Sequence, residues 1–158
     1  MSRINYVHLA GGGVTAGVIY NVSSAIAWET ALSNDFASQL GRQLSQKAAP
    51  TAMIAGYAVG MIAVSLYLLL SERQIPWIKA ATMAAAITWL LAVALPSYMV
   101  WSFGMFSGSL LARSSAFGAV EILLATLMGA WVYNWGETMS VARARRPQIA
   151  KELRVQEQ

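Results

Sequence analysis

The sequence predicts an all-α integral membrane protein, a four-helix bundle with both termini in the cytoplasm. Three observations predict this fold class. Hydrophobic residues make up 57% of the 158 residues and charged residues only 11%, whereas about 25% of the residues in a soluble domain are charged. The apolar residues are concentrated in four runs of membrane-spanning length. Most of the lysines and arginines lie on one side of these runs.

The composition excludes several classes of site. The chain has no cysteine, which excludes disulfides, thiolate metal sites and thiol nucleophiles. A single histidine, His8, excludes a haem held by two histidines of this chain. The net charge of +4 does not indicate nucleic-acid binding, because most of the basic residues flank membrane spans. We therefore expect membrane lipids, and no nucleic acid, among the partners.

The first predicted span covers residues 5–28, which we interpret as an uncleaved signal-anchor helix. Gly13 and Gly17 are four residues apart, and Asn21 continues their stripe along the helix. Small residues at this spacing let another helix approach closely. The pattern therefore favours a helix–helix contact, with a ligand site as the alternative.

The segment 30–50 is predicted to be amphipathic and to lie on the outer side of the membrane. Leu32, Phe36, Leu40 and Leu44 recur at every fourth position among polar residues, which is typical of a helix with a narrow apolar stripe. One interpretation is a helix that lies on the membrane surface or extends the first span. The alternative is a docking surface for a partner protein.

The second and third spans are predicted at residues 51–70 and 77–101, joined by a short turn that makes them antiparallel neighbours. Gly56 and Gly60 form a second pair of small residues four positions apart. Pro96 removes a helix hydrogen bond, and we expect it to kink or fray the end of the third span.

The fourth span is predicted at residues 112–135. Gly118, Ala125 and Gly129 share a face with Glu121, which suits close packing of the other helices around it. The chain is thus divided into a membrane domain, 1–137, and a basic cytoplasmic tail, 138–158, in which we expect a break at Pro147.

The lysine and arginine counts predict the orientation. Eight of these residues fall at the N-terminus, in and just after the loop that follows the second span, or in the tail, and three fall on the other side. The eight are Arg3, Arg73, Lys79, Arg143, Arg145, Arg146, Lys151 and Arg154, and the three are Arg42, Lys47 and Arg113. Because positive residues favour the cytoplasmic side, both termini are predicted there.

Glu121 is the most informative polar residue. It lies about nine residues into the fourth span, so a rise of 1.5 Å per residue places it roughly 14 Å deep. A carboxyl group at that depth costs about 2.5–3.5 kcal/mol on insertion scales, so we expect it to face protein or water. The expected intramembrane polar cluster consists of Glu121, Asn21, Thr15 and Thr88. It would fix helix register by a hydrogen bond, couple to protons or ions, or ligate a cofactor or lipid.

The sequence contains no nucleophile–base pair, no phosphate-binding glycine loop and no metal-ligand cluster. We therefore predict no catalytic residues and no metal site. The sequence implies no particular cofactor and leaves open whether one is bound. His8 is expected at the cytoplasmic end of the first span with its ring among the lipid headgroups. Axial ligation of a haem or chlorophyll is the alternative for this residue, and a weak one.

Three stretches carry a family resemblance: residues 4–21 with GGVTAGVIYN, residues 89–97 with WLL and LPS, and residues 118–133 with GAVE and GAWVY. They resemble the first, third and fourth helices of an uncharacterised family of small bacterial four-span membrane proteins, over about residues 4–137. Members often carry a further glutamate shortly after the first-helix asparagine, where this chain has Ser23, Ser24 and Ala25. The resemblance implies a four-helix membrane fold and no activity.

These observations lead to a functional hypothesis: a non-enzymatic accessory or scaffolding subunit of a larger complex in the bacterial cytoplasmic membrane. Small-residue faces on at least three spans support it, because they exceed what a lone bundle needs. The expected protein partners are other membrane subunits or further copies of the chain. The alternative is a small homo-oligomeric transporter or channel with Glu121 as its protonatable group, and a membrane enzyme is third.

Overall fold

The computed structural model describes residues 5–40, 48–72 and 75–156. In these residues every regular element is helical, and they form four continuous helices. The elements are α1 (Tyr6–Ala27), η1 (Trp28–Leu32), α2 (Ser33–Leu40), α3 (Ala48–Ser71), α4 (Trp77–Trp89), η2 (Leu90–Ala94), α5 (Leu95–Ser102) and α6 (Gly108–Gln156). The predicted all-helical fold is confirmed for this part of the chain.

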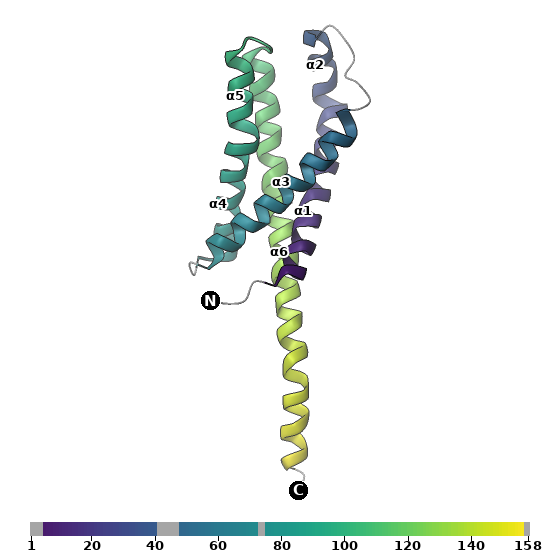
Figure 1. Cartoon of the computed structure of the whole chain (residues 1–158), viewed down its shortest axis with the longest axis vertical. Coiled ribbons are helices and arrows are strands. Elements are labelled where there is room, and N and C mark those ends of the chain that lie inside the picture. Colours follow the sequence, from purple (N-terminus) through teal and green to yellow (C-terminus); the bar gives the residue numbers. More distant parts are fainter. Residues whose placement is uncertain (1–4, 41–47, 73–74, 157–158) are drawn as a thin grey trace.

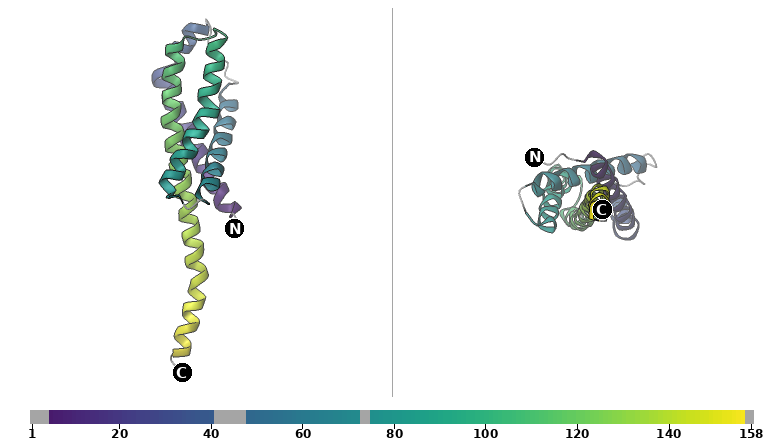
Figure 2. Two further views of the ribbon diagram at one scale, coloured as in Figure 1. Left: turned by 90° about the vertical axis from the view of Figure 1, so that its left-hand side faces the viewer. Right: turned by 90° about the horizontal axis from the view of Figure 1, so that it is seen from below.

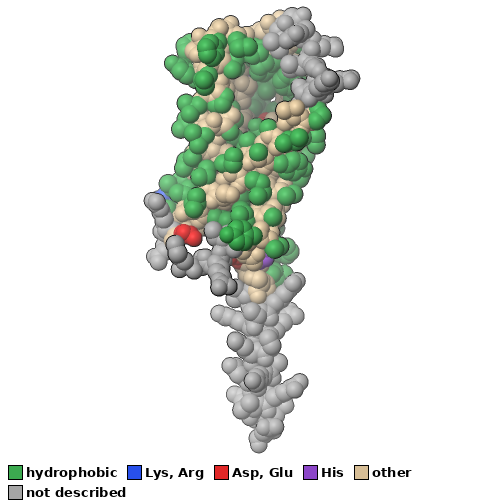
Figure 3. Space-filling model, viewed as in Figure 1, with side chains coloured by type: hydrophobic (Ala, Val, Ile, Leu, Met, Phe, Trp, Pro, Cys, Tyr) green, Lys and Arg blue, Asp and Glu red, His purple; other side chains and the backbone are tan. Residues whose placement is uncertain are grey.

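Each of the four helices contains a segment long and apolar enough to cross a membrane. These segments are Tyr6–Gln39, Pro50–Ser71, Trp77–Ser102 and Gly108–Ser140. Large hydrophobic side chains, including Ile54, Leu91 and Val22, lie exposed on the outside of the bundle, and they cover much of the face drawn in Figure 3. Exposed apolar surface of this extent suits a multi-pass membrane protein, in which lipid covers it.

Local sequence explains where the helices begin. Asn5 caps α1 with its side-chain oxygen, which accepts hydrogen bonds from the backbone N–H groups of Val7 (3.2 Å) and His8 (3.4 Å). Pro76 precedes the first residue of α4. Between α5 and α6 the chain turns at Gly104, whose φ of +68° is a backbone conformation that glycine adopts without strain.

Two π turns interrupt the helices without ending them. η1 joins α1 to α2, so the first span continues as a helix beyond residue 28. The amphipathic segment therefore extends the first span through residues 33–40, and its residues 41–47 lie outside the described part. In η2, the N–H of Leu95 donates to the carbonyl of Leu90, just before Pro96. The disturbance expected at Pro96 thus takes the form of a π turn, and the helix continues to Ser102.

The helices pack in a closed cycle. α1 packs on α3 and α6, and α4 packs on the same two helices from the other side. α3 crosses the bundle obliquely, so that it lies against α1 at one end and against α4 at the other (Figure 1). We call the end at which α1 begins the inner end, and the end that carries α2 and α5 the outer end.

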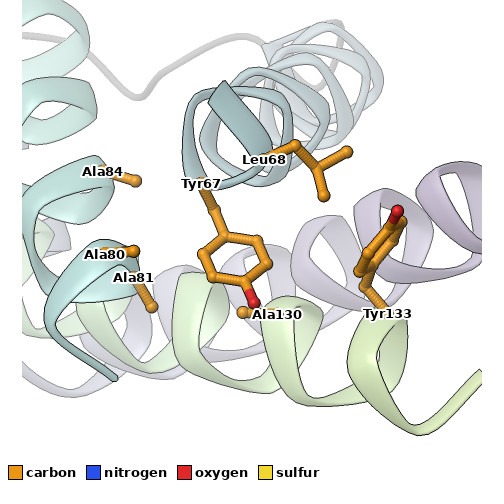
Figure 4. Packing of buried hydrophobic residues seen from close by; sticks show 7 residues of the cluster. All are labelled: Tyr67, Leu68, Ala80, Ala81, Ala84, Ala130 and Tyr133. Atoms are coloured by element: carbon orange, nitrogen blue, oxygen red, sulfur yellow. The ribbon is translucent and has the colours of Figure 1, made fainter. Parts of the chain in front are cut away.

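The main apolar cluster lies near the inner end. Figure 4 shows the Tyr67 ring of α3 between alanines of α4 and Ala130 of α6. Tyr67 is 1% exposed, and its hydroxyl donates a 2.8 Å hydrogen bond to the side-chain oxygen of Asn134. Alanines on α4 let the large ring approach the helix backbone, which brings α3, α4 and α6 into close contact.

α6 is a single helix of 49 residues. It continues well past the inner ends of the other helices (Figures 1 and 2). The break expected at Pro147 is wrong, because the helix runs through this residue to Gln156. Proline removes one helix hydrogen bond and costs about 3 kcal/mol in a helix interior, which a long helix can absorb without ending.

Candidate functional site

α1 carries two neighbouring stripes with a spacing of four residues, and each stripe faces a different helix. Gly13, Gly17 and Asn21 face α3. Gly12 and Ala16 face α6, and Tyr20 and Ser24 continue that stripe toward Glu121. Because residues four apart lie on one helix face, both stripes could be found in the sequence. Only the first was predicted.

The contact between α1 and α6 is closest at two glycines. A Cβ atom placed on Gly12 would lie 2.7 Å from the carbonyl oxygen of Gly129, and one placed on Gly129 would lie 2.7 Å from the carbonyl oxygen of Gly12. The two backbones therefore touch directly. Ala16 and Ala125 pack together one turn further along, with Val64 of α3.

The contact between α1 and α3 uses the predicted glycines. A Cβ atom on Gly60 would meet the backbone of Gly17 and would lie 2.9 Å from the carbonyl oxygen of Gly13. One on Gly56 would meet the side chain of Asn21. The remaining predicted packing residue, Gly118, faces Val93 of η2 at 3.1 Å by the same measure. All six predicted packing glycines thus lie at contacts inside this chain.

Glu121 lies on the α6 face that packs against α1, and its side chain is 7% exposed. The hydroxyl groups of Ser24 and Tyr20 lie near its carboxyl group. Ser24 was not among the predicted cluster residues. The signal that could have identified it is its position four residues after Tyr20 on the stripe that faces α6.

The other members of the predicted polar cluster make different contacts. The side-chain amide of Asn21 donates to the carbonyl oxygen of Met53 on α3 (3.1 Å). The hydroxyl of Thr15 donates to the carbonyl oxygen of Gly11 in its own helix (2.9 Å). Thr88 is 2% exposed, and its hydroxyl has no hydrogen-bond partner among the described residues. The structure brings Glu121 together with Ser24 and Tyr20. Among the described residues, Asn21 and Thr15 hydrogen-bond elsewhere, and Thr88 makes no hydrogen bond.

His8 packs against protein at the inner end. Its ring lies edge-on to the Tyr133 ring, with centroids 6.3 Å apart, and it covers the backbone of Gly136. Its Nδ1 atom is buried without a hydrogen-bond partner in the described part of the chain. Because Gly136 has no Cβ atom, the His8 ring can approach the backbone of α6 closely.

Two hollows occur elsewhere. At the inner end, a cavity of about 290 Å³ is lined by Tyr67, Leu68, Ser71, Glu72, Tyr133, Asn134 and Glu137. The Tyr133 hydroxyl donates to the Glu137 carboxylate there (3.0 Å). At the outer end, a groove of about 280 Å³ between α5 and α6 is lined by Ser97, Tyr98, Trp101, Gly108, Leu111, Ala112 and Ser115. No group of three or more His, Cys, Asp or Glu residues placed to hold a metal ion occurs within residues 5–40, 48–72 and 75–156.

Compared with models of protein families, with curated proteins and with solved structures, the chain matches none of them. The resemblance to small bacterial four-span proteins therefore remains an expectation. The function of the chain is therefore inferred from its own geometry.

Proposed function

We propose that the chain is a non-enzymatic accessory or scaffolding subunit of a larger assembly in a bacterial cytoplasmic membrane, with both termini in the cytoplasm. The observation that supports this proposal is the length of α6. In the sequence the residues after Ser140 are polar and basic, and the helix continues through them to Gln156. At about 1.5 Å per residue, the 16 residues beyond Ser140 extend roughly 24 Å.

A helix of this kind needs a partner for stability. Most helical stability in proteins comes from packing rather than from intrinsic propensity. Pro147 lies inside this extension and costs about 3 kcal/mol in a helix interior. The extension is also basic in sequence, which suits the cytoplasmic side. We therefore assign the extension of α6 as the docking segment for another subunit.

The small-residue faces no longer support this proposal. The glycines of α1, α3 and α6 are used in contacts among these three helices. The small-residue surface that was expected to exceed the needs of a lone bundle is thus covered by other helices of this chain. The subunit proposal therefore depends on the extension of α6.

The test compares the full chain with a variant that ends after Ser140, each extracted gently from its own membrane. A subunit should show a native mass well above that of a 17.0 kDa chain, with other polypeptides in stoichiometric amount. The truncated variant should keep its membrane fold and lose those polypeptides. A full-length protein that is a pure monomer or homo-oligomer would refute the proposal.

The second candidate function is a proton-coupled transporter or channel, and the burial of Glu121 favours it. Intramembrane carboxyl groups often mark proton pathways, and the recorded partners of Glu121 are the hydroxyl-bearing residues Ser24 and Tyr20. Glu121→Gln keeps the size of the side chain and its ability to hydrogen-bond. A transporter should lose pH-dependent flux in this variant while it still folds, whereas a scaffold should keep its partners and its stability.

A further inference from the structure

Three contacts join α2 to the outer end of α6 and the loop before it. The Asp35 carboxylate pairs with the Arg113 guanidinium group at 2.6 Å. Gln39 bonds twice to Ser107: its amide N–H donates to the hydroxyl oxygen (2.9 Å), and its carbonyl oxygen accepts from the backbone N–H (2.8 Å). We call residues 33–39 of α2 the strap.

An aromatic contact accompanies the polar ones. The rings of Phe36 and Phe106 meet edge to face with centroids 5.0 Å apart, and the Trp28 ring also packs against Phe36, with centroids 5.4 Å apart. Phe106 belongs to the turn between α5 and α6. The strap therefore holds the outer end of the first span against the outer end of the fourth.

The strap and Glu121 lie on the same contact between helices. Arg113, Glu121 and Gly129 follow one another at intervals of eight on α6, and each of them meets a residue of the first span: Asp35, Ser24 and Gly12. Arg113 is eight residues outward of Glu121, about 12 Å along the helix axis. On the first span, Asp35 is eleven residues outward of Ser24, which is about 16 Å.

The contact between α1 and α6 is closest inward of Glu121. There Ala125 and Gly129 are buried against α1, and the backbones of Gly12 and Gly129 touch. The space-filling surface is recessed between the outer halves of these helices (Figure 3), and the ribbons separate there (Figure 1).

The strap is built from contacts that break easily. Arg113 and Asp35 are 57% and 42% exposed, and exposed ion pairs contribute little stability and are screened by salt. The hydrogen bonds of Gln39 are also at the surface, where water competes for the same groups. Opening the strap therefore costs much less than separating the glycine contacts further in.

We propose that the strap is a reversible closure over the outer part of the α1–α6 contact, and that it controls access from the outer side to Ser24 and Glu121. This goes beyond the subunit function, and it holds whether or not the protein moves protons. Opening exposes the outer half of the contact, and the glycine-packed inner half keeps α1 and α6 together.

The test uses a single thiol in a chain that has no cysteine of its own. Ser24→Cys is close to isosteric and places the thiol beside Glu121. A thiosulfonate reagent that does not cross bilayers is applied to the outer side of reconstituted vesicles, and the rate of labelling is measured. Adding Arg113→Ala should raise the rate about threefold to fivefold, and adding Gln39→Ala as well should raise it about tenfold.

Two controls make the result specific. A Thr126→Cys reporter, close to isosteric and fully buried inward of Glu121, should label at an unchanged rate when Arg113→Ala is added, because the inner packing stays closed. In the Ser24→Cys background, the charge exchange Asp35→Arg with Arg113→Asp should restore the slow rate. An unchanged rate in the Arg113→Ala, Gln39→Ala variant would overturn the proposal. Equal acceleration at both reporters would also overturn it, since that result indicates general loosening of the fold.

Discussion

The inner and outer halves of this bundle are held together by different means. In the inner half, α1 meets α3 and α6 at glycines whose backbones touch, and Tyr67 fills the space between α3, α4 and α6. In the outer half, the first span is joined to α6 and its preceding loop by one exposed ion pair, two hydrogen bonds and a contact between two phenylalanines.

A chain rich in glycine and alanine can thus be held tightly at one end and more loosely at the other. Backbone contact inside a membrane depends on many small dispersion terms that vanish together when the helices separate. Contacts between exposed side chains are replaced by water with little loss. Glu121 lies between the glycine contact of the inner half and the Asp35–Arg113 ion pair of the outer half.

The largest expected effect comes from filling the glycine contact. Gly60→Ala places a Cβ atom against the backbones of Gly13 and Gly17, and overpacking of this kind costs about 1–3 kcal/mol. Gly11→Ala is the matched control, because open space surrounds that position on α1. Alanine there should leave stability unchanged or raise it by up to about 1 kcal/mol. Unfolding by denaturing detergent measures both, and equal stabilities would contradict the contact.

The next effect should come from the inner cluster. Tyr67→Phe removes the hydroxyl that donates to Asn134 and leaves the amide oxygen without that partner. The loss should be about 1–2 kcal/mol in the free energy of unfolding. Replacing Tyr98, which is exposed at the outer end, by Phe should cost less than a third of that. If the two variants lose the same stability, the buried hydrogen bond from Tyr67 to Asn134 does not contribute the expected stability.

At Thr88 we expect a substitution that raises stability rather than lowering it. Its buried hydroxyl has no partner among the described residues, so Thr88→Val removes an unmet hydrogen-bonding group from an apolar site. Stability should rise by up to about 1 kcal/mol in the same detergent titration. A loss of stability would show that the hydroxyl group has a partner, such as a bound water.

The smallest effect on stability is expected at the strap. Asp35→Asn removes the charge that pairs with Arg113, and exposed pairs of this kind contribute about 0–1 kcal/mol. The effect should fall further at high salt. Unfolding titrations at low and high ionic strength measure it. A large loss of stability that does not depend on salt would show that the strap is held as firmly as the inner half.

The sequence predicted the helical fold because length and apolarity alone decide whether a segment can span a membrane. It predicted Gly13, Gly17, Gly56 and Gly60 as packing residues because spacing defines a helix face. It did not predict Ser24 as a partner of Glu121, since a pairing between helices depends on how they are rotated about their axes. Spacing within one helix leaves that rotation open.

The course of α6 at Pro147 and the partner of Asn21 were predicted wrongly, because local sequence preferences alone do not decide them. Pro147 was expected to break α6, and the helix continues through it, because the loss of one hydrogen bond does not by itself end a long helix. Asn21 was expected beside Glu121, yet its amide bonds to the Met53 carbonyl on α3. A position beside Gly56 gives this side chain a nearer backbone partner.

The most direct test of the difference between the two halves is a pair of distance distributions from spin labels, which the absence of native cysteines makes simple. Labels at Ala10 and Thr138 report on the inner end, and labels at Asn34 and Ala112 report on the outer end, all at exposed positions. In lipid nanodiscs, the inner distribution should be narrow and unaffected by Arg113→Ala. The outer distribution should be broader and should widen further in that variant. Two distributions of equal width, both insensitive to Arg113→Ala, would contradict the account.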